Sequence, residues 1–422
     1  MDLQKITNAL RSASSELSLQ NALQKNTALL SVIKSIESNR SVILSANAED
    51  VQKARSKGMS ESLVERLALD DKKINSIIES IKVIISQTDP IGEEVAGWKT
   101  PNGMTIRQVR VPLGVVAIIY ESRPNVTADA FALAYKSGNS ILLRGSSSAL
   151  KSNQAIVKAI KEGLSSEDAK GCGIPEAIEL APCESHEEVD EILTAVGQID
   201  VALPRGGAKL INTVIEKAKV PVIQTGAGIC HLFVDEKADL EMATNIAYNA
   251  KTQRPGACNA IECILIHEQS AKAFLPKLAN SFAGKVELRA DEKSFNILNG
   301  INSELKLTKA TDEDFGFEFL DFTCAVKIVS DIDEAIKYIN THNTKHSECI
   351  VTQNLSNAEL FQAKVDAACV YVNSSTRFTD GGEFGFGAEL GISTQKLHAR
   401  GPMGIKALTT TKYLINGNGQ IR

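Results

Sequence analysis

From residue 115 to residue 372 the chain repeats one pattern, in which a short apolar run is followed by a segment with helical periodicity. The apolar runs form two series, at 115–119, 141–143, 201–203 and 221–223, and then at 231–234, 261–266, 325–329, 349–351 and 370–372. Apolar strands that alternate with helices are typical of parallel sheets covered by helices on both faces. We therefore predict two α/β domains that meet near residues 226–235.

The segments outside this pattern have different periodicities. Residues 1–88 read as helix, with Leu29, Val32, Ile33 and Ile36 at helical spacing, and residues 89–92 close that block. A turn at 101–103 is followed by alternating residues at 104–111, as in an exposed hairpin. Residues 409–415 are strand-like, and we expect them to return to this ribbon, which is of a kind that often serves subunit contacts.

Composition excludes several classes of protein. A chain of 422 residues with 43% hydrophobic content can bury two or three cores, and its net charge of −5 gives no general attraction to nucleic acid or anionic membranes. No signal peptide and no run of eighteen apolar residues is found, which predicts a cytoplasmic protein. The eight cysteines are irregularly spaced without a CxxC pair, which argues against bound metal and a disulfide framework.

One of these cysteines, Cys258, lies in a turn directly before the apolar run 261–266. Pro255 and Gly256 break regular structure there, and the nearby positive charges of Lys251 and Arg254 would lower a thiol pKa. The pattern therefore favours a nucleophilic thiol. An unpaired cysteine that serves only as a small buried hydrophobe fits the same window.

Two further turns carry groups suited to phosphate, although no GxGxxG fingerprint occurs. Pro204, Arg205, Gly206 and Gly207 end one apolar run before a helical segment, where backbone N–H groups and the helix dipole can bind a pyrophosphate. Residues 144–148, which end another run, combine an arginine with three serines. A plain turn and a serine helix cap are the alternatives for these two segments.

The long polar loop at 372–391 carries Arg377 just after a strand, which is typical of a substrate-pocket rim, although a loose surface loop fits as well. Serine hydrolase and zinc peptidase chemistry are disfavoured, since neither a GxSxG serine with His and Asp partners nor an HExxH motif occurs.

Taken together, six blocks resemble the aldehyde dehydrogenase superfamily over essentially the whole chain. They are residues 118–126, 137–145, 203–208, 251–260, 371–382 and 393–404, the last of which is typical of one reductase branch. The resemblance implies an α/β, aldehyde-dehydrogenase-like fold with a Rossmann-type cofactor domain (1–92 and 113–225) that lacks GxGxxG. It also implies an α/β catalytic domain (226–404) and a small oligomerisation ribbon (93–112 and 405–422), and hence a homodimer or higher oligomer.

The resemblance also assigns residues. It implies Cys258 as the nucleophile, with its backbone N–H as an oxyanion donor and Cys263 in the following strand. It places Gln224 where hydrolytic members carry a general-base glutamate. The implied NADPH-binding residues are Arg144, Ser146, Ser147, Pro204, Arg205, Gly206 and Gly207. The implied substrate-binding residues are Asn125, also a candidate oxyanion donor, together with Arg254, Ser375 and Arg377.

The implied activity is NADPH-dependent reduction of L-glutamyl 5-phosphate to L-glutamate 5-semialdehyde and phosphate through a Cys258 thioester, in proline biosynthesis. Glutamate 5-kinase is the implied partner, and direct transfer of the acyl phosphate from it stays open. Two other interpretations stay open as well. One is an aldehyde dehydrogenase for another aldehyde or a coenzyme A thioester, and the other is a catalytically silent scaffold.

Overall fold

The structure, a computed structural model, describes residues 2–182, 185 and 187–422, without the side chains of residues 62 and 208. The chain divides into two compact units. Unit 1 comprises residues 1–225, 385–391 and 402–422, and unit 2 comprises residues 226–384 and 392–401. Each unit is described by itself below.

Unit 1 is built on a four-stranded parallel sheet in the order β5-β4-β3-β6. Strand β3 is buried at every residue, as expected for a parallel strand covered on both faces. The strands are β3 (Val115–Tyr120), β4 (Ser140–Arg144), β5 (Ile178–Leu180) and β6 (Val201–Arg205). The helices that follow them are α6 (Asn125–Lys136), α7 (Leu150–Leu164), α8 (Glu187–Thr194) and α9 (Ala208–Lys217).

Three of the four apolar runs predicted in this unit are strands, and the fourth prediction is wrong. Residues 221–223 form only an isolated parallel bridge between Val222 and Ala202. Pro221 offers its carbonyl to the Ala202 N–H but has no N–H of its own, so the ladder cannot extend through it.

The helical prediction for residues 1–88 is confirmed in type, but the segment is five helices rather than one. They are α1 (Leu3–Leu17), α2 (Ala22–Ser38), α3 (Arg40–Ser56), α4 (Glu61–Leu67) and α5 (Asp71–Ser86). The Asn21 and Gln24 side chains form a capping box at the start of α2. Gly163 of α7 lies so close to α2 that a Cβ there would be 2.7 Å from the Val32 Cα, so only glycine permits this packing.

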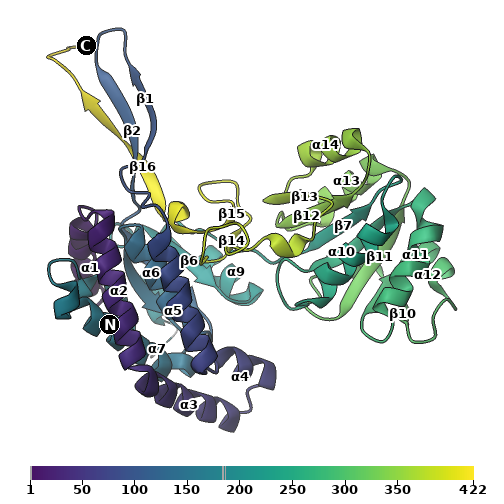
Figure 1. Cartoon of the computed structure of the whole chain (residues 1–422), viewed down its shortest axis with the longest axis horizontal. Coiled ribbons are helices and arrows are strands. Elements are labelled where there is room, and N and C mark those ends of the chain that lie inside the picture. Colours follow the sequence, from purple (N-terminus) through teal and green to yellow (C-terminus); the bar gives the residue numbers. More distant parts are fainter. Residues whose placement is uncertain (1, 183–184, 186) are drawn as a thin grey trace. The chain divides into compact units, whose positions relative to one another are not determined.

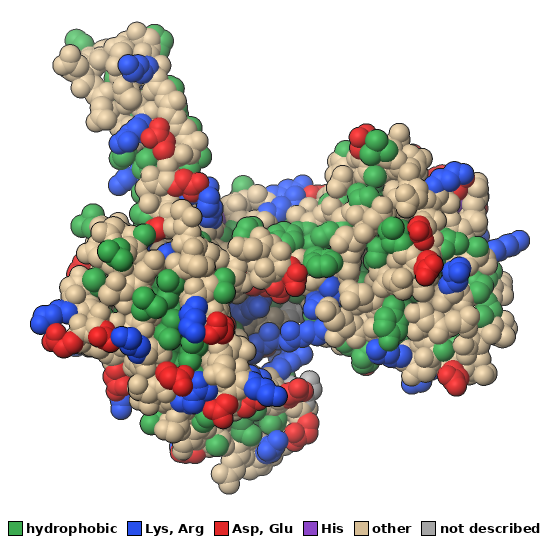
Figure 2. Space-filling view, viewed as in Figure 1, with side chains coloured by type: hydrophobic (Ala, Val, Ile, Leu, Met, Phe, Trp, Pro, Cys, Tyr) green, Lys and Arg blue, Asp and Glu red, His purple; other side chains and the backbone are tan. Residues whose placement is uncertain are grey.

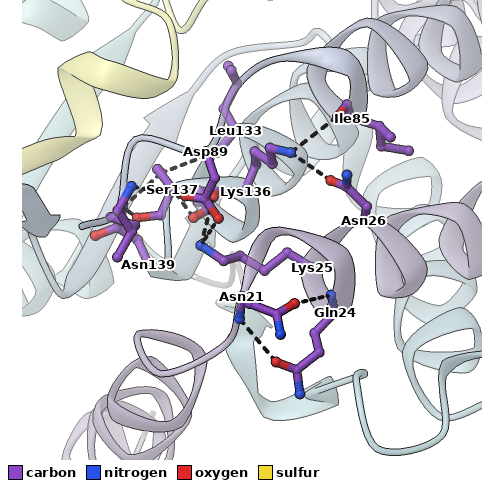
Figure 3. A network of polar contacts seen from close by, with 12 residues as sticks. Asn21, Gln24, Lys25, Asn26, Ile85, Asp89, Leu133, Lys136, Ser137 and Asn139 are labelled. Carbon is purple, nitrogen blue, oxygen red and sulfur yellow. Dashed lines mark hydrogen bonds and ion pairs between the residues drawn. The ribbon is translucent and has the colours of Figure 1, made fainter. Parts of the chain in front are cut away.

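A buried polar network joins α2, the end of α5 and α6 (Figure 3). Lys25 is fully buried, and its ammonium lies 2.6 Å from the Asp89 carboxylate and donates to the Lys136 carbonyl at 3.3 Å. The Lys136 ammonium in turn donates to Asn26 at 2.6 Å and to the Ile85 carbonyl at 3.1 Å. Burial lowers the pKa of Lys136. The network fastens three helices just before the chain enters the ribbon.

That ribbon is a three-stranded antiparallel sheet in the order β1-β2-β16, which confirms the predicted return of the C-terminal strand. The strands are β1 (Glu94–Lys99), β2 (Thr105–Pro112) and β16 (Thr409–Asn416). Hydrophobic side chains lie on its surface (Figure 2), where Trp98 and Tyr413 meet edge to face at 6.1 Å and, like Ile415, are exposed.

Unit 2 is built on a seven-stranded parallel sheet in the order β10-β9-β11-β8-β7-β12-β13 (Figure 1). All five strands predicted here are present, and β9 and β10 are additional. The strands are β7 (Cys230–Val234), β8 (Ile261–His267), β9 (Glu287–Ala290), β10 (Lys306–Lys309), β11 (Thr323–Val329), β12 (Ser347–Val351) and β13 (Cys369–Val372). The helices are α10 (Leu240–Thr252), α11 (Glu268–Phe282), α12 (Glu292–Leu298), α13 (Ile332–His342) and α14 (Leu355–Lys364).

The segments after residue 384 divide between the units. Residues 385–391 and 402–404, which we had grouped with the second domain, belong to unit 1. The reason is close packing at glycines. Gly387 lies against Val83 of α5, and Gly391 lies against the Arg205 guanidinium, in each case at 2.7 Å from the place of a Cβ. The short strands β14 (Ile392–Ser393) and β15 (Gly401–Pro402) lie between these segments in the chain.

Candidate active site

Cys258 lies in the turn between α10 and β8, at the amino end of β8 in unit 2. Two backbone hydrogen bonds form the turn, from the Ala257 N–H to the Arg254 carbonyl at 3.1 Å and from the Ala260 N–H to the Ala257 carbonyl at 3.0 Å. Cys258 is partly exposed. The local sequence that predicted a break before β8 therefore produces a turn with an accessible cysteine.

The other cysteines of unit 2 are all buried, namely Cys230, Cys263, Cys324, Cys349 and Cys369. Burial raises the pKa of the Cys230 and Cys263 thiols well above the usual value, and raises that of Cys324 and Cys349 to about 12. Because the thiolate is the nucleophile, these four thiols are unreactive at neutral pH. Among the described cysteines of this unit, Cys258 is the candidate that reagents can reach.

The backbone of Cys258 is held from behind by the segment that leads into β7. A Cβ at Gly228 would collide with the Cys258 carbonyl, so this close approach requires glycine. The Cys230 thiol donates to the same carbonyl oxygen at 3.3 Å, and the Gly228 N–H donates to the Glu318 carboxylate at 2.6 Å. Burial raises the pKa of Glu318. The sequence alone does not indicate this contact, because Gly228 and Cys258 are distant in the chain.

Lys251 corrects one expectation. It was predicted to supply positive charge to the thiol, but its side chain is fully buried and lies 2.5 Å from the buried Glu262 carboxylate. Glu262 also accepts from the Leu320 N–H at 3.1 Å. Burial raises the pKa of Glu262 to about 7, against the smaller opposing effect of Lys251. The Lys251 charge is therefore matched by a carboxylate, and Arg254 is the exposed cation of this turn.

The loop after β13 turns back along the sheet toward Cys258. Asn373 makes the reversal with a left-handed φ of 55°, a conformation that asparagine tolerates better than most residues. Ser375 is buried, and its hydroxyl accepts from the Arg377 N–H at 3.3 Å, so it caps the short helix at Thr376–Phe378. The Ser375 hydroxyl thus orders the loop that carries Arg377.

The Arg377 side chain is half-buried, and its Nε donates to the side-chain Oε1 of Gln253 at 3.0 Å. Burial lowers the pKa of Arg377, the neighbouring charge of Arg254 lowers it further, and Cys258 raises it. These mutual effects place the three groups within electrostatic range of one another. Two arginines thus belong to the segments around Cys258, and guanidinium groups are suited to an anionic substrate.

The second predicted site lies in unit 1, at the end of β3. In the sheet, β4 lies on one side of β3 and β6 on its other side, so the direction of strand connection reverses at β3. In such sheets ligands bind outside the carboxyl ends of the strands at this switch point. Gly206 and Gly207 are exposed there, with Gly207 as the N-cap of α9, while Pro204 is buried. The Glu121 carboxylate lies 2.6 Å from the place of a Gly206 Cβ, so a pyrophosphate at this turn requires that side chain to move.

Arg144 ends β4 at the same sheet edge. Its Nη1 and Nη2 donate to the carbonyls of Gly145 at 3.0 Å and Ser185 at 2.8 Å, while its buried Nε has no partner among the described residues. Ser146 accepts from the Ser148 N–H at 3.3 Å, which is the serine cap that we considered as an alternative, whereas Ser147 is exposed. The guanidinium is thus already oriented by backbone carbonyls.

A cavity of about 500 Å³ lies next to β4 and β5. It is lined by residues of α7 and by the end of β5, including Gln154, Val157, Lys158, Lys161, Leu180 and Ala181. The Ala181 N–H donates to the Leu143 carbonyl at 2.8 Å, so the cavity lies at the strand end that carries Arg144. Glu162 and Glu179 also line the cavity and pair with Lys158 and Lys161, so these lysines are matched by carboxylates.

Asn125 begins α6, and its Nδ2 donates to the Asp129 carboxyl at 3.2 Å. Burial raises the pKa of Asp129. Gln224 lies in unit 1, directly before Thr225, whose hydroxyl donates to the Pro204 carbonyl at 2.9 Å. Asn125 and Gln224 thus belong to unit 1, whereas Cys258, Arg254, Ser375 and Arg377 lie together in unit 2.

Comparison with known proteins shows the family of the chain and its fold. Residues 1–295 and 323–413 match the aldehyde dehydrogenase family. The chain is 50% identical to a γ-glutamyl phosphate reductase of Clostridium novyi, over 98% of this chain and 97% of that one. It is 49% identical to the reductase of the same name from Ligilactobacillus salivarius, over 100% and 99%. The crystal structure of a γ-glutamyl phosphate reductase from Thermotoga maritima superposes with a TM-score of 0.95, at 46% identity and full coverage of both chains.

None of the described helices combines the length and the apolar run that crossing a bilayer requires. The fold is the mixed α/β fold of aldehyde dehydrogenases, with parallel sheets in both units. With matches to the family over most of its length, and with relatives named γ-glutamyl phosphate reductase at half identity, this chain belongs to the aldehyde dehydrogenase family.

Proposed function

We propose that the protein reduces L-glutamyl 5-phosphate to L-glutamate 5-semialdehyde and phosphate with NADPH, through a Cys258 thioester, as the second step of proline biosynthesis in the cytoplasm. The names of its relatives support this reaction. The observation that carries it is the partly exposed Cys258 thiol, in a turn that also holds the exposed Arg254 and that Asn259 ties by hydrogen bonds to the loop of Arg377. A nucleophile beside two cations suits a substrate that is both an acyl donor and a phosphate.

In the first step the Cys258 thiolate attacks the acyl carbon. A C–S bond forms, the acyl C–O bond breaks, and phosphate leaves with the electron pair of that bond. Arg254 and Arg377 hold the phosphate and offset its charge as it leaves. The Nη atoms of Arg377 make no hydrogen bond to the described residues and are therefore available to a ligand. Ser375 supports this loop, and Asn125 with the Cys258 N–H is the candidate oxyanion donor.

NADPH, when bound, supplies the hydride that reduces the thioester carbonyl. The backbone N–H groups at Gly206 and Gly207, with the α9 dipole and with Pro204 and Arg205 shaping the turn, would hold its pyrophosphate. Arg144, Ser146 and Ser147 would surround the adenosine ribose beside the cavity of about 500 Å³. The planar, always charged Arg144 guanidinium is a group suited to the 2′-phosphate. The C–S bond then breaks, which releases the semialdehyde and restores the Cys258 thiolate.

Gln224 explains the direction of the reaction. A carboxylate in its place would activate water and hydrolyse the thioester, whereas a carboxamide has no basic group at neutral pH. The thioester therefore survives until it is reduced. We expect the ribbon to pair with a second copy of the chain, since its surface exposes Trp98, Tyr413 and Ile415. We also expect glutamate 5-kinase to supply the acyl phosphate.

The reaction can be tested in the oxidative direction, by following NADP reduction with glutamate semialdehyde and either phosphate or coenzyme A. We expect activity with phosphate alone, and we expect Cys258→Ala to abolish it by at least about 10³-fold, because the variant lacks the thiol that forms the thioester. The matched control is Cys263→Ala, which removes a thiol that burial makes unreactive. Activity with coenzyme A in place of phosphate, or equal activity of both variants, would overturn the proposal.

A further inference from the structure

Asn259, the residue after Cys258, lies between the nucleophile's turn and the loop that carries Arg377. Its side chain is only 4% exposed. Its Nδ2 donates to the Thr379 carbonyl at 3.0 Å and to the Arg377 carbonyl at 3.3 Å. In return, the Thr376 hydroxyl donates to the Asn259 backbone carbonyl at 2.6 Å. Three hydrogen bonds on both sides of Arg377 therefore fasten the loop to the residue that follows the nucleophile.

The loop is also fixed from its other side. The Thr379 hydroxyl is hydrogen-bonded to Ser347 of β12 at 2.6 Å and to the Tyr371 hydroxyl of β13 at 2.8 Å. The Arg377 Nε donates to Gln253, which precedes the turn of Cys258. Gln253 and Asn259 thus hold Arg377 from the two ends of the turn. As a result, the loop backbone at Arg377 is fixed by several hydrogen bonds, and the guanidinium is oriented by its Nε bond to Gln253.

The Asn259 side chain forms its hydrogen bonds to the described residues through its NH₂ group. Its Oδ1 is buried without a partner among the described residues, an arrangement that costs stability. The NH₂ group, which donates to two carbonyls, is therefore the part of this amide that supports the loop. A carboxylate at this position would place a negative oxygen against the same carbonyls.

We propose that Asn259 is a positioning residue that sets the place of the Arg377 guanidinium relative to Cys258, and thereby the affinity for the phosphate that the substrate carries. The inference rests on the proposed function, because phosphate is the ligand that function assigns to Arg377. Asn259 does not touch the reacting atoms. It acts through the loop at 376–379, which moves away from the turn when the amide donors are removed.

The test uses the full-length enzyme and inorganic phosphate as the probe. Asn259→Ala should raise the KM for phosphate in the oxidative assay by about tenfold or more, because a small displacement of a positioning group weakens binding strongly. The KM for NADP should not change. Phosphate should also protect Cys258 from iodoacetamide in the unaltered enzyme, and should do so only at correspondingly higher concentration in Asn259→Ala.

Two further variants make the test specific. Thr376→Val removes the hydroxyl that donates to Asn259, and we expect a smaller rise in the phosphate KM, of about threefold. Asn340→Ala is the matched control. Asn340 also bridges two backbone groups, donating to the Lys364 carbonyl at 2.9 Å and accepting from the Asp366 N–H at 2.9 Å, but it does so between α13 and the end of α14. We expect the phosphate KM to stay unchanged in this variant.

An unchanged phosphate KM and unchanged protection in Asn259→Ala would overturn the inference, as would an equal loss of phosphate and NADP affinity. If Asn259→Ala does not fold, Thr376→Val decides the question by the same two measurements. A lack of phosphate dependence in the unaltered enzyme would instead refute the proposed function. Phosphate dependence of the unaltered enzyme with unaffected variants would refute the role of Asn259 alone.

Discussion

Each unit buries one lysine against one carboxylate, and the two pairs have nearly the same geometry. In unit 1 the Lys25 ammonium lies 2.6 Å from Asp89, and in unit 2 the Lys251 ammonium lies 2.5 Å from Glu262. Both lysine side chains are fully buried. The pairs differ in what lies between their members along the chain, which is a set of helices in one case and the turn of Cys258 in the other.

This difference shows that a buried lysine–carboxylate pair can have two structural roles. Asp89 also accepts from the Ile91 N–H at 2.9 Å, so Lys25 ties α2 to the segment that leads from α5 into the ribbon (Figure 3). Lys251 and Glu262 instead join the end of α10 to the start of β8 and close the loop that carries Cys258. The same chemistry supports the architecture of one unit and the geometry of a reactive group in the other. A buried ion pair therefore indicates a functional site only when the residues between its two members in the chain carry reactive groups.

The strongest test of this comparison replaces each lysine by methionine. Lys25→Met and Lys251→Met should each lower the free energy of unfolding by about 3–5 kcal/mol, because each leaves a buried carboxylate unpaired. Only Lys251→Met should also slow the alkylation of Cys258 by iodoacetamide. Urea unfolding and the labelling rate measure the two effects.

The double variant Lys25→Met/Asp89→Leu is the control for the unit 1 pair, because removal of both charges should restore most of the lost stability. Slower alkylation in Lys25→Met, at a urea concentration where that variant is folded, would show that the two pairs are not separate in function.

The second test uses pH. Burial raises the pKa of Glu262 to about 7 in the folded protein, above the value near 4.5 of an exposed glutamate. The folded state therefore keeps a proton that the unfolded state loses, so this contribution to stability is complete below pH 4.5 and is lost as pH rises to 7. The loss is at most about 3 kcal/mol. Glu262→Gln should flatten this part of the stability profile, and an unchanged slope would contradict the assignment.

The sequence predicted the buried strands of both sheets, because apolar runs such as 115–119 and 261–266 are covered on both faces. It did not predict the short, partly exposed strands β5, β9 and β10, and it predicted a strand at 221–223 where there is an isolated bridge. It also located the Cys258 turn, since Pro255 and Gly256 exclude regular structure. It did not predict that Lys251 is buried. A lysine in the last turn of a helix usually extends into solvent, and its burial depends on Glu262, which packing places opposite it.

The contacts of Gly228 and Asn259 were missed for a related reason. Each contact joins residues that are distant in the chain, since Gly228 touches the Cys258 backbone and Asn259 bonds the loop at 376–379. No local pattern encodes such a contact. Spacing and composition predict elements and turns, whereas the partners of a buried polar group follow from how the elements pack.

The smallest expected effect concerns an exposed ion pair, which can be compared with the two buried pairs. Lys34 lies on α2 with Lys25, and its ammonium is 2.8 Å from Asp168, with the two side chains 69% and 57% exposed. Lys34→Met should change the free energy of unfolding by less than about 1 kcal/mol, since water solvates both charges in either state. Urea unfolding at low and high salt measures it. Because both lysines lie on one helix and receive the same substitution, helix propensity cancels between them. A loss as large as that of Lys25→Met would mean that burial is not what makes the two inner pairs strong.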